Sequence, residues 1–391
     1  MLSFQVLVIM NNKFKSGEYK TSFIGKEYEY RSFIPSFLNS PFEWEDKKIP
    51  MLLEEASHSL GSLNECSLLV PDINTFIKMN VLKEATISTR IEGTRTEIEE
   101  AVLSEKDIAP EKRDDWNEVH NYIDAMNHAV DIIKKIPLSI RVLKEIHQIL
   151  LKGVRGEKKQ SGEIRKSQNW IGGKTITNAH FVPPSFNELP NLLTDLEKFW
   201  NNNNLNIPKI MKVALTHYQF ETIHPFLDGN GRIGRLLITL ELLYYGILNK
   251  PILYISDFLE RNKDDYFNNL DRVRNTNEID NWLIFFLKGI IETASKSKTT
   301  FEKVIELRLQ YENKIRTLGR RTQLGQNLLI LFFSYPIIDT STVATNLDIA
   351  FNTAKSILKE FENLKMVRIF PIEKSKKKLF VLWDYFNLYK A

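Results

Sequence analysis

The residues best suited to chemistry lie in one short segment, residues 224–237, with the sequence HPFLDGNGRIGRLL. Gly229 and Gly231 can adopt positive φ and expose successive N–H groups, and the apolar run after them predicts a helix from about Arg232. A nest of N–H groups at the partly positive start of a helix binds anions, phosphates in particular. The segment therefore predicts a phosphate site.

The side chains around this nest are suited to handling a polyphosphate. Arg232 and Arg235, three residues apart, lie near one helical face and can both reach it. Asp228 is well placed to hold Mg²⁺ between phosphates, and His224 is suited to accept a proton from an attacking hydroxyl. Phe226 is interpreted as the apolar anchor of the loop. The alternative, a solvated glycine-rich connection with a surface histidine, does not explain the joint spacing, and the Gly-Lys-Ser/Thr ending and preceding strand of the usual phosphate loops are missing.

The twelve residues HPFLDGNGRIGR resemble the Fic-domain signature H-x-F-x-[D/E]-G-N-G-R-x-x-R at every defined position. The resemblance implies a protein adenylyltransferase, which moves AMP from ATP to a Ser, Thr or Tyr hydroxyl of a protein substrate, itself included, and releases pyrophosphate. The resemblance implies that His224 is the general base and that Asp228 is the Mg²⁺ ligand. It implies that the α and β phosphates bind Asn230, Gly231 and Arg232 and that the γ phosphate binds Arg235. It also implies three further nucleotide-binding positions, Gly229, Ile233 and Gly234. A phosphate-transferring branch has lysine at the Gly231 position, so Gly231 favours AMP transfer. A branch that uses phosphocholine donors stays open.

A second segment, residues 169–184 with the sequence NWIGGKTITNAHFVPP, predicts a small β-hairpin because a β-branched run lies among Gly, Asn and Pro. It resembles the family's flap, which pairs with the target segment by β-strand addition, and the resemblance implies that His180, Phe181 and Val182 line it. An ordinary surface hairpin is the alternative.

Residues 254–274 resemble the family's helix that closes over the nucleotide, which places Tyr266 and Arg274 as candidate nucleotide contacts. A core or surface position is the equal alternative for both. Tyr122, an aromatic residue at helical spacing, is interpreted as simply packed.

The segment STRIEGT, residues 88–94, resembles the family's inhibitory pattern [S/T]-x-x-x-E-[G/N]. Ser88 and Glu92 are four residues apart and hence on one helical face, and Gly93 can end that helix. The resemblance implies an autoinhibitory pairing of Glu92 with Arg235, which takes the arginine that the γ phosphate needs. In some family members this glutamate supports removal of AMP, so deadenylylation of the same targets stays open.

Helical spacing of apolar residues covers most of the 391-residue chain, of which 43% is hydrophobic and 26% charged. We expect a mainly α protein: an N-terminal helical region with the inhibitory motif (1–110), a Fic catalytic domain that is a helical bundle with a small β-hairpin flap (111–300), and a C-terminal α+β winged helix-turn-helix domain (318–391). Gly61 and Gly93 are the expected helix stops within 48–104.

Positive charge gathers in the C-terminal region. The chain carries a net charge of +4, and residues 319–391 hold 11 Lys or Arg against 6 Asp or Glu. The second helix of the predicted winged helix begins near Phe351 and presents Asn352, Thr353, Lys355 and Lys359 outward, while the lysines of KSKKK (374–378) lie on the wing. The alternative function is therefore a DNA-binding regulator with the Fic domain as a sensor, although the exposed face has few arginines and winged helices also serve protein contacts.

Other features narrow the function class. A single cysteine, Cys66, excludes an internal disulfide and a cysteine-rich zinc site, and we expect an inert core thiol in a cytoplasmic protein. The seven histidines form no H-E-x-x-H pattern, which disfavours a zinc enzyme. The first ten residues are apolar but too short to span a membrane and lack a basic leader, so we expect no membrane partner and a loose start, with Met10 as an alternative initiator. A homodimer that controls the Glu92 helix stays open.

Overall fold

The computed structural model describes residues 13–69, 73–371 and 378–390. Met10 and most of the predicted wing, residues 374–377, lie outside the described residues. Within the described part of the chain, no helix is both long enough and apolar enough to cross a membrane.

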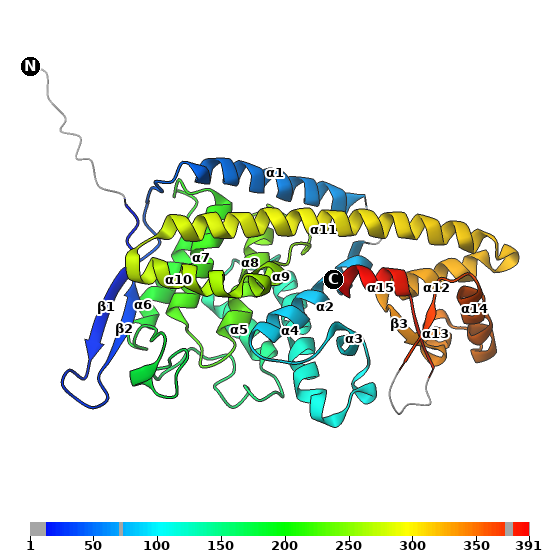
Figure 1. The fold of residues 1–391 in the computed structure, drawn as a ribbon, viewed down its shortest axis with the longest axis horizontal. Helices are drawn as coiled ribbons and strands as arrows, with labels where there is room; N and C mark the ends of the chain where they lie inside the picture. The colour runs from blue at the N-terminus through cyan, green and yellow to red at the C-terminus, as the bar shows by residue number, and fades with distance from the viewer. Residues whose placement is uncertain (1–12, 70–72, 372–377, 391) are drawn as a thin grey trace, which may run out of the picture.

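Helices make up most of the molecule, which confirms the predicted mainly α class (Figure 1). The helices up to the C-terminal region are α1 (Lys48–Leu68), α2 (Ile73–Ile91), α3 (Ile98–Ala101), α4 (Arg113–Ile132), α5 (Ile140–Leu150), α6 (Leu189–Asn201), α7 (Lys209–Ile223), α8 (Asn230–Tyr244), α9 (Ser256–Arg261), α10 (Lys263–Thr276) and α11 (Ile279–Arg316). Several begin as capping rules expect: the Ser139 hydroxyl accepts a hydrogen bond from Val142 N–H (3.4 Å) at the start of α5, and α6 has a proline in its first turn.

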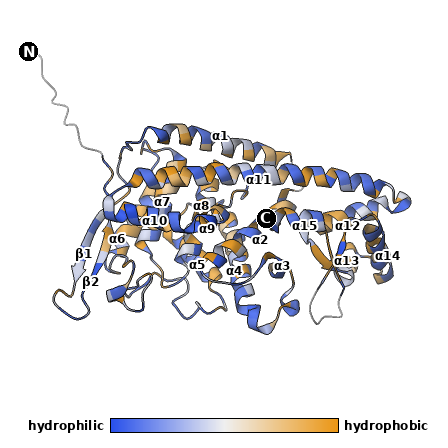
Figure 2. Cartoon of the chain, viewed as in Figure 1, coloured by the Kyte–Doolittle hydropathy of each residue, from blue (hydrophilic) through white to orange (hydrophobic). Residues whose placement is uncertain are grey.

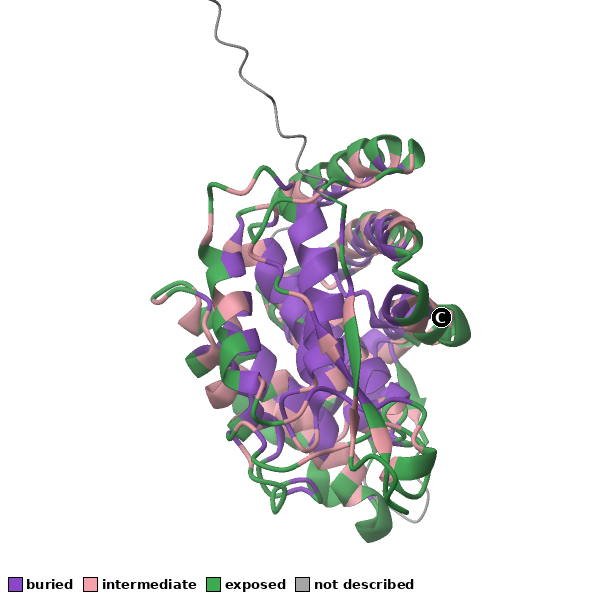
Figure 3. Cartoon of the chain, turned by 90° about the vertical axis from the view of Figure 1, so that its left-hand side faces the viewer, coloured by how far each residue is buried: buried purple, intermediate pink, exposed green. Residues whose placement is uncertain are grey.

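The antiparallel pair α7 and α8 forms the centre of the body. Nearly every residue of both helices is buried, which is typical of a core helix rather than a surface helix. Buried residues gather in the middle of the body and exposed ones on its outer helices and loops (Figure 3). The segment that joins α7 to α8 is the glycine-rich motif, so the core itself holds the motif in place.

Helices α1 and α11 lie side by side along one edge of the molecule (Figure 1). Both carry hydrophilic and hydrophobic residues in alternation (Figure 2), the pattern of a helix with one buried face. Helix α11 has 38 residues and therefore spans about 57 Å at 1.5 Å per residue. It passes without a break through residue 300, where the sequence suggested the end of the catalytic domain, and it connects the catalytic body to the C-terminal region.

Helix α1 corrects one expectation, because it does not stop at Gly61 but continues to Leu68. Gly61 is in the helical region of φ and faces open space, so it costs only about 1 kcal/mol relative to alanine. The buried face of α1, which includes Leu60 and Leu63 on either side of the glycine, outweighs that cost. Gly93, by contrast, has φ +104 and follows the end of α2 at Ile91, as predicted.

The β structure differs from the prediction in two places. The predicted flap hairpin consists of one antiparallel bridge, Ile171 with Phe181, and a 3₁₀ turn over Ile176–Asn178. Consecutive glycines at φ +69 and a capping box between Thr175 and Asn178 turn the chain before a ladder can extend. A hairpin that the sequence analysis missed joins β1 (Gly17–Ser22) to β2 (Tyr30–Pro35) in register Gly17 with Pro35. Its signal was a pair of aromatic and β-branched runs around Gly25.

The C-terminal region has its own small sheet. Its elements are α12 (Thr322–Ser334), β3 (Ile337–Asp339), α13 (Thr340–Leu347), α14 (Phe351–Asn363), β4 (Arg368–Phe370), β5 (Leu379–Val381) and α15 (Trp383–Lys390), with antiparallel strand order β3-β5-β4. Asp348 makes the turn between α13 and α14 in the left-handed region (φ +50). The assignment as a winged helix-turn-helix and the three domain boundaries stay predictions.

Candidate active site

The motif folds as a tight turn between helices α7 and α8. The residue that follows α7 and the residue that precedes α8 both have left-handed backbone angles. Helix α7 ends at Ile223, and His224 follows at φ 49, ψ 61; Gly229 at φ 76 then caps α8, which begins at Asn230, two residues before the predicted start. Asn230 closes the turn, since its side-chain oxygen accepts from Phe226 N–H and its amide donates to Phe226 C=O, both at 2.8 Å. The side chain that was expected to bind phosphate is therefore engaged in shaping the loop, and it is buried.

Phe226 anchors this turn, as the sequence indicated, by stacking on a histidine that the sequence analysis did not single out. The rings of Phe226 and His147 lie 3.9 Å apart at an interplanar angle of 9°. His147 Nδ1 accepts from Gly162 N–H (2.8 Å), so Nε2 donates to Asp228 C=O (2.9 Å). Burial lowers the pKa of His147 to about 4 and keeps the ring neutral. Only its position on the buried face of α5 hinted at this role.

Asp228 and Arg232 belong to a group of charged side chains that pair with one another at the glycine-rich turn. Asp228 accepts from Gly229 N–H (2.7 Å), pairs with Lys159 (2.9 Å) and lies 3.3 Å from Arg232. Burial works to raise its pKa, but Lys159 and Arg232 outweigh burial and hold the pKa below the ordinary value. Arg232 also pairs with the buried Glu118 (2.8 Å), a residue that sequence reasoning missed. The carboxylate of Asp228 is thus ionised and partly exposed.

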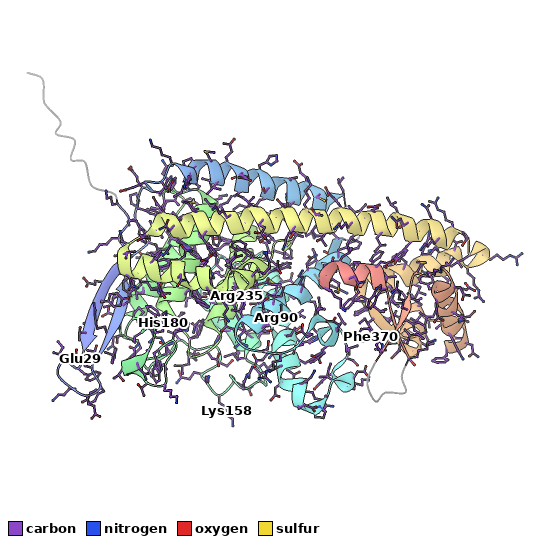
Figure 4. All side chains as sticks on the ribbon, in the orientation of Figure 1. Glu29, Arg90, Lys158, His180, Arg235 and Phe370 are labelled. Carbon is purple, nitrogen blue, oxygen red and sulfur yellow. The ribbon has the colours of Figure 1, made fainter. Side chains whose placement is uncertain are left out.

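Arg235 is bound by Ser88 in the last turn of helix α2 and by Glu92, which follows the end of that helix. Its Nε donates to the Ser88 hydroxyl (2.9 Å), and Nη2 donates to Ser88 C=O and to Glu92, both at 2.7 Å. The pairing of Glu92 with Arg235, expected from the resemblance, is therefore present. Figure 4 shows Arg235 in the interior of the helical body; its side chain is 2% exposed, whereas that of Glu92 is 38% exposed.

The carboxylate of Glu92 also lies over the start of α8. A Cβ atom placed on Gly231 would meet Glu92 Oε1 at 2.2 Å, so the glycine allows this close approach. Gly231 has helical φ, against the expectation of positive φ at both glycines; only Gly229 is left-handed. Burial works to raise the pKa of Glu92, and the Arg235 charge more than reverses that, which leaves the pKa below the ordinary value. An anion thus already lies at the helix start that was predicted to bind phosphates.

The next two positions of the motif face the core. Ile233 is fully buried, and Gly234 is closed over by Glu221, whose Oε1 would meet a Cβ at 2.2 Å. The carbonyl of Gly234 bonds to His217 Nδ1 (3.0 Å). Neither side-chain position is open to a nucleotide, so any contact through Ile233 or Gly234 would use the backbone. Burial raises the pKa of Glu221 to about 7.

His224 is held as a neutral base. Burial is the main reason that its pKa falls to about 4; the positive charges of Arg165 and Arg274 add to this effect, and Glu92 opposes it. A neutral imidazole at pH 7 is ready to accept a proton, which is what general-base chemistry requires.

The predicted flap lies between β2 and α10. Phe33 N–H of β2 donates to Val182 C=O (3.0 Å), and the rings and chains of Phe181 and Val182 are buried. His180 is exposed and pairs with Asp271 of α10 (2.7 Å); it lies on the left of the helical body in Figure 4.

The two candidate nucleotide contacts of α10 are packed. The Arg274 guanidinium lies 3.8 Å from the Phe181 ring centroid and bonds to Thr222 and Asp271, both at 3.2 Å. Tyr266 is buried, and its hydroxyl bonds to His217 Nε2 (2.9 Å). Tyr122 is also packed, as expected, with its hydroxyl 3.1 Å from Glu84. The nucleotide-binding role of Tyr266 and Arg274 stays a prediction.

The other predicted positions do not form a second site of this kind. Cys66 is buried, and burial raises the pKa of its thiol. In the described ranges no cluster of three or more His, Cys, Asp or Glu side chains is arranged to hold a metal ion. On α14, Asn352, Lys355 and Lys359 are exposed and Thr353 is half-buried, and Lys359 pairs with Glu362 (3.2 Å). DNA binding by residues 318–391, a cytoplasmic location and a homodimer stay predictions.

Comparison with known proteins finds two segments of the chain that match models of one family. Residues 51–131 match the Fic/DOC family N-terminal model, and residues 137–242 match the Fic/DOC family model. The protein adenylyltransferase Fic of Drosophila erecta is 30% identical over 135 residues, and that of Drosophila melanogaster 31% identical; each alignment covers 34% of this chain and 26% of the relative. The chain thus spans about a quarter of the length of these curated relatives.

Solved structures support the fold. A Fic family protein from Desulfovibrio desulfuricans G20 superposes with a TM-score of 0.57 at 19% identity, over 88% of this chain and 98% of that chain. A Fic domain containing signaling protein from Bacteroides thetaiotaomicron VPI-5482 gives a TM-score of 0.52 at 21% identity, over 66% of this chain and 97% of that chain.

Proposed function

Because residues 51–131 and 137–242 belong to the Fic/DOC family, we propose that the protein is an autoinhibited protein adenylyltransferase. It transfers AMP from ATP to a hydroxyl side chain of a protein substrate, itself included, and releases pyrophosphate. The observation that carries this proposal is the juxtaposition of a neutral base, His224, with a helix start whose arginine is taken by a carboxylate of another helix.

His224 acts as the general base in the transfer. Its neutral ring accepts the proton of the target hydroxyl while that oxygen forms a bond to the α phosphorus of ATP. The bond between the α phosphorus and its bridging oxygen to the β phosphorus breaks, and pyrophosphate leaves with the electron pair. The N–H groups at the start of α8 and the guanidinium of Arg232 bind the α and β phosphates, and Arg235 binds the γ phosphate.

Asp228 fits the role of the Mg²⁺ ligand that the resemblance implies. It offers one ionised, partly exposed carboxylate next to the proposed phosphate site, and Mg²⁺ is commonly bound through one or two carboxylates together with substrate phosphates. When bound, the ion neutralises phosphate charge. Lys159, which now pairs with Asp228, must release one carboxylate oxygen for that.

Glu92 supplies the inhibition. Its carboxylate lies over Gly231 and binds Arg235, so it adds negative charge where the nucleotide must place its own and occupies the arginine intended for the γ phosphate. ATP then binds in a pose with a badly aligned α phosphate. The resting enzyme is therefore nearly inactive, and departure of the α2 end is the activating step.

Residues 171–182 form the docking site for the target. The flap has a single internal bridge rather than a ladder, and we expect an extended target segment to pair with its backbone by β-strand addition. Backbone pairing supports many target sequences and leaves the identity of the target open. Removal of AMP by the same site stays the alternative reaction.

The test measures incorporation of AMP from ATP labelled at the α phosphate, with wild type, Glu92→Gly and the double variant Glu92→Gly/His224→Ala. We expect at least a tenfold rise for Glu92→Gly over wild type and a return to background in the double variant, because general-base catalysis contributes about 10²–10⁴-fold. Glu105→Gly, which removes an exposed glutamate elsewhere, is the matched control and should equal wild type.

Two results would contradict the proposal separately. Equal incorporation by wild type and Glu92→Gly would remove the inhibitory role of Glu92. Equal incorporation by Glu92→Gly and the double variant would remove His224 as the base and, with it, the proposed reaction at this site.

A further inference from the structure

Arg165 stands out because its charged side chain is buried next to the catalytic turn. Arg165 is 2% exposed, and among the described residues no carboxylate pairs with its guanidinium. Burial lowers its pKa to about 10. Burying a guanidinium without an ion-pair partner costs free energy unless its N–H groups all donate hydrogen bonds. The acceptors of those hydrogen bonds therefore indicate what Arg165 does in the structure.

The guanidinium joins the catalytic turn to the flap. Nε donates to His224 C=O (3.0 Å), and Nη2 donates to Pro184 C=O (2.6 Å) and, more weakly, to Ile223 C=O (3.4 Å). Nη1 donates to Ser167 C=O in its own loop (3.1 Å). One rigid, planar group thus holds the general base, the end of the flap and the loop between them.

The backbone near Arg165 continues the same contacts. Arg165 N–H donates to Pro225 C=O (2.9 Å), and the side-chain amide of Asn169 donates to His224 C=O (3.3 Å) and Phe226 C=O (3.0 Å). The carbonyls of residues 223–226 are therefore bound, one after another, by a single neighbouring segment.

The turn needs this support for two physical reasons. The last carbonyls of α7 have no partners within the helix and carry its partial negative charge, which a guanidinium neutralises. His224 is also a non-glycine residue in the left-handed region, a conformation that persists only when its surroundings enforce it.

We propose that Arg165 is a positioning residue for AMP transfer: by binding the carbonyls of His224 and Pro184 in one fork, it fixes the general base relative to the flap that presents the target hydroxyl. This inference rests on the proposed function and adds a residue to it. Because proton transfer and attack depend on placement within about 1 Å, loss of the fork lowers the rate of the chemical step more than it weakens ATP binding.

Arg165 also acts on His224 through its charge. The charged side chains that face the His224 ring are Glu92, Arg165 and Arg274, and the two arginines disfavour the imidazolium. Removing Arg165 therefore raises the pKa of His224, so the neutral base is lost at a higher pH. A residue that only stabilised the fold would not shift the acid limb of the pH profile.

The experiment uses the full chain with Glu92→Gly as the active parent. Arg165→Met removes charge and fork, Arg165→Lys keeps the charge without the planar fork, and Lys166→Met, at the exposed neighbouring residue, is the matched control. We expect kcat to fall at least tenfold in both Arg165 variants with KM for ATP within threefold of the parent. The acid limb of kcat/KM should move to higher pH in Arg165→Met alone. Lys166→Met should match the parent.

Folding is measured in parallel by thermal unfolding and by hydrogen exchange at the amides of residues 181 and 182 and of residues 223, 224 and 226, which should lose protection together. If Arg165→Met does not fold, Arg165→Lys and Asn169→Ala decide the question, since the latter removes two bonds to the turn and keeps the arginine. We expect Asn169→Ala to lower kcat less than Arg165→Lys.

Folded Arg165 variants with parental kcat, or a loss of kcat explained by the unfolded fraction, would overturn the inference. An inactive Glu92→Gly parent would instead contradict the proposed function, so the two failures are distinguishable.

Discussion

The α7–α8 pair and the C-terminal region differ in whether polar side chains are buried among the apolar ones. Between residues 212 and 241 the buried polar or charged residues are Lys212, Thr216, His217, Gln219, Glu221, Thr222, Asn230, Arg232, Arg235, Thr239 and Glu241. Among the described residues from 318 onward, no Ser, Thr, Asn, Gln, His, Lys, Arg, Asp or Glu is buried. The core there is aromatic and aliphatic, with Phe333 edge-on to Tyr385 at 4.8 Å and Phe332 stacked on Phe361 at 6.1 Å.

This difference indicates where function constrains the fold. Burying a polar group without full compensation costs free energy, and perturbed pKa values such as those of His224 and Glu221 concentrate at sites of chemistry. The described part of the C-terminal region, by contrast, has an apolar core with its polar side chains at the surface. Substitutions that remove one charge should therefore have large effects on AMP transfer in the first region and small ones in the second.

The largest expected effect is that of Asp228→Asn in the Glu92→Gly parent. The substitution keeps the shape of the side chain but removes the negative charge that we propose to bind Mg²⁺, so we expect AMP incorporation to fall at least a hundredfold. Initial rates measured across a MgCl₂ titration check this. Asp124→Asn, at an exposed position on α4, is the control, and a parental rate for Asp228→Asn would show that the carboxylate is dispensable.

Ser88→Ala should release the enzyme only in part. It removes the hydroxyl that accepts from Arg235 Nε, whereas the Ser88 carbonyl and Glu92 still bind the guanidinium. Since one hydrogen bond to a charged group contributes about 1.5–3 kcal/mol, we expect a several-fold rise in AMP incorporation over wild type, below that of Glu92→Gly. Thr89→Ser is the control. A rate equal to wild type would mean that Glu92 alone holds Arg235.

The pH dependence should be weak above pH 6. His224 must be neutral to act, and its folded-state pKa of about 4 lies below the ordinary 6.5, so activity is present at neutral pH and lost only as pH falls toward 4. Glu92 raises this pKa, so Glu92→Gly lowers it further. We expect kcat/KM of that variant to change less than about twofold between pH 6 and 8. An acid limb centred near 6.5 would contradict the half-buried, neutral base.

The smallest expected effect on catalysis comes from α14. Lys355→Ala together with Lys359→Ala changes exposed charges far from the buried polar groups, so AMP incorporation should stay within twofold of the parent and stability within about 0.5 kcal/mol. A mobility shift with random duplex DNA at low salt, wild type against this variant, tests the alternative function. A lysine-dependent, salt-sensitive shift would support it, and no shift with wild type would remove it.

Much of the fold and site could be predicted from the sequence because the signals are local. Helical spacing marked α4, α5, α7 and α11, and the order of glycines and polar residues in 224–235 marked a helix start with a base before it. The pairing of Glu92 with Arg235 came from a resemblance, since the spacing of Ser88, Glu92 and Gly93 is common at helix ends.

The rest was decided by long-range contacts that leave no pattern in the chain. Gly61 did not end its helix because α11 covers the buried face of α1, and the flap remained a loop because its glycines and its capping turn compete with a ladder. Glu118, His147 and Arg165 are isolated polar residues in unremarkable sequence, and each binds the motif from 59 or more residues away.

The sequence by itself predicted which residues could carry the chemistry and where several helices begin or end, because capping, glycine conformation and periodicity act within a few residues. Only the tertiary structure decided the protonation state of His224, the support of its turn and the occupation of Arg235. Burial and Coulomb interactions set these properties, and both depend on groups that meet only when distant segments pack together.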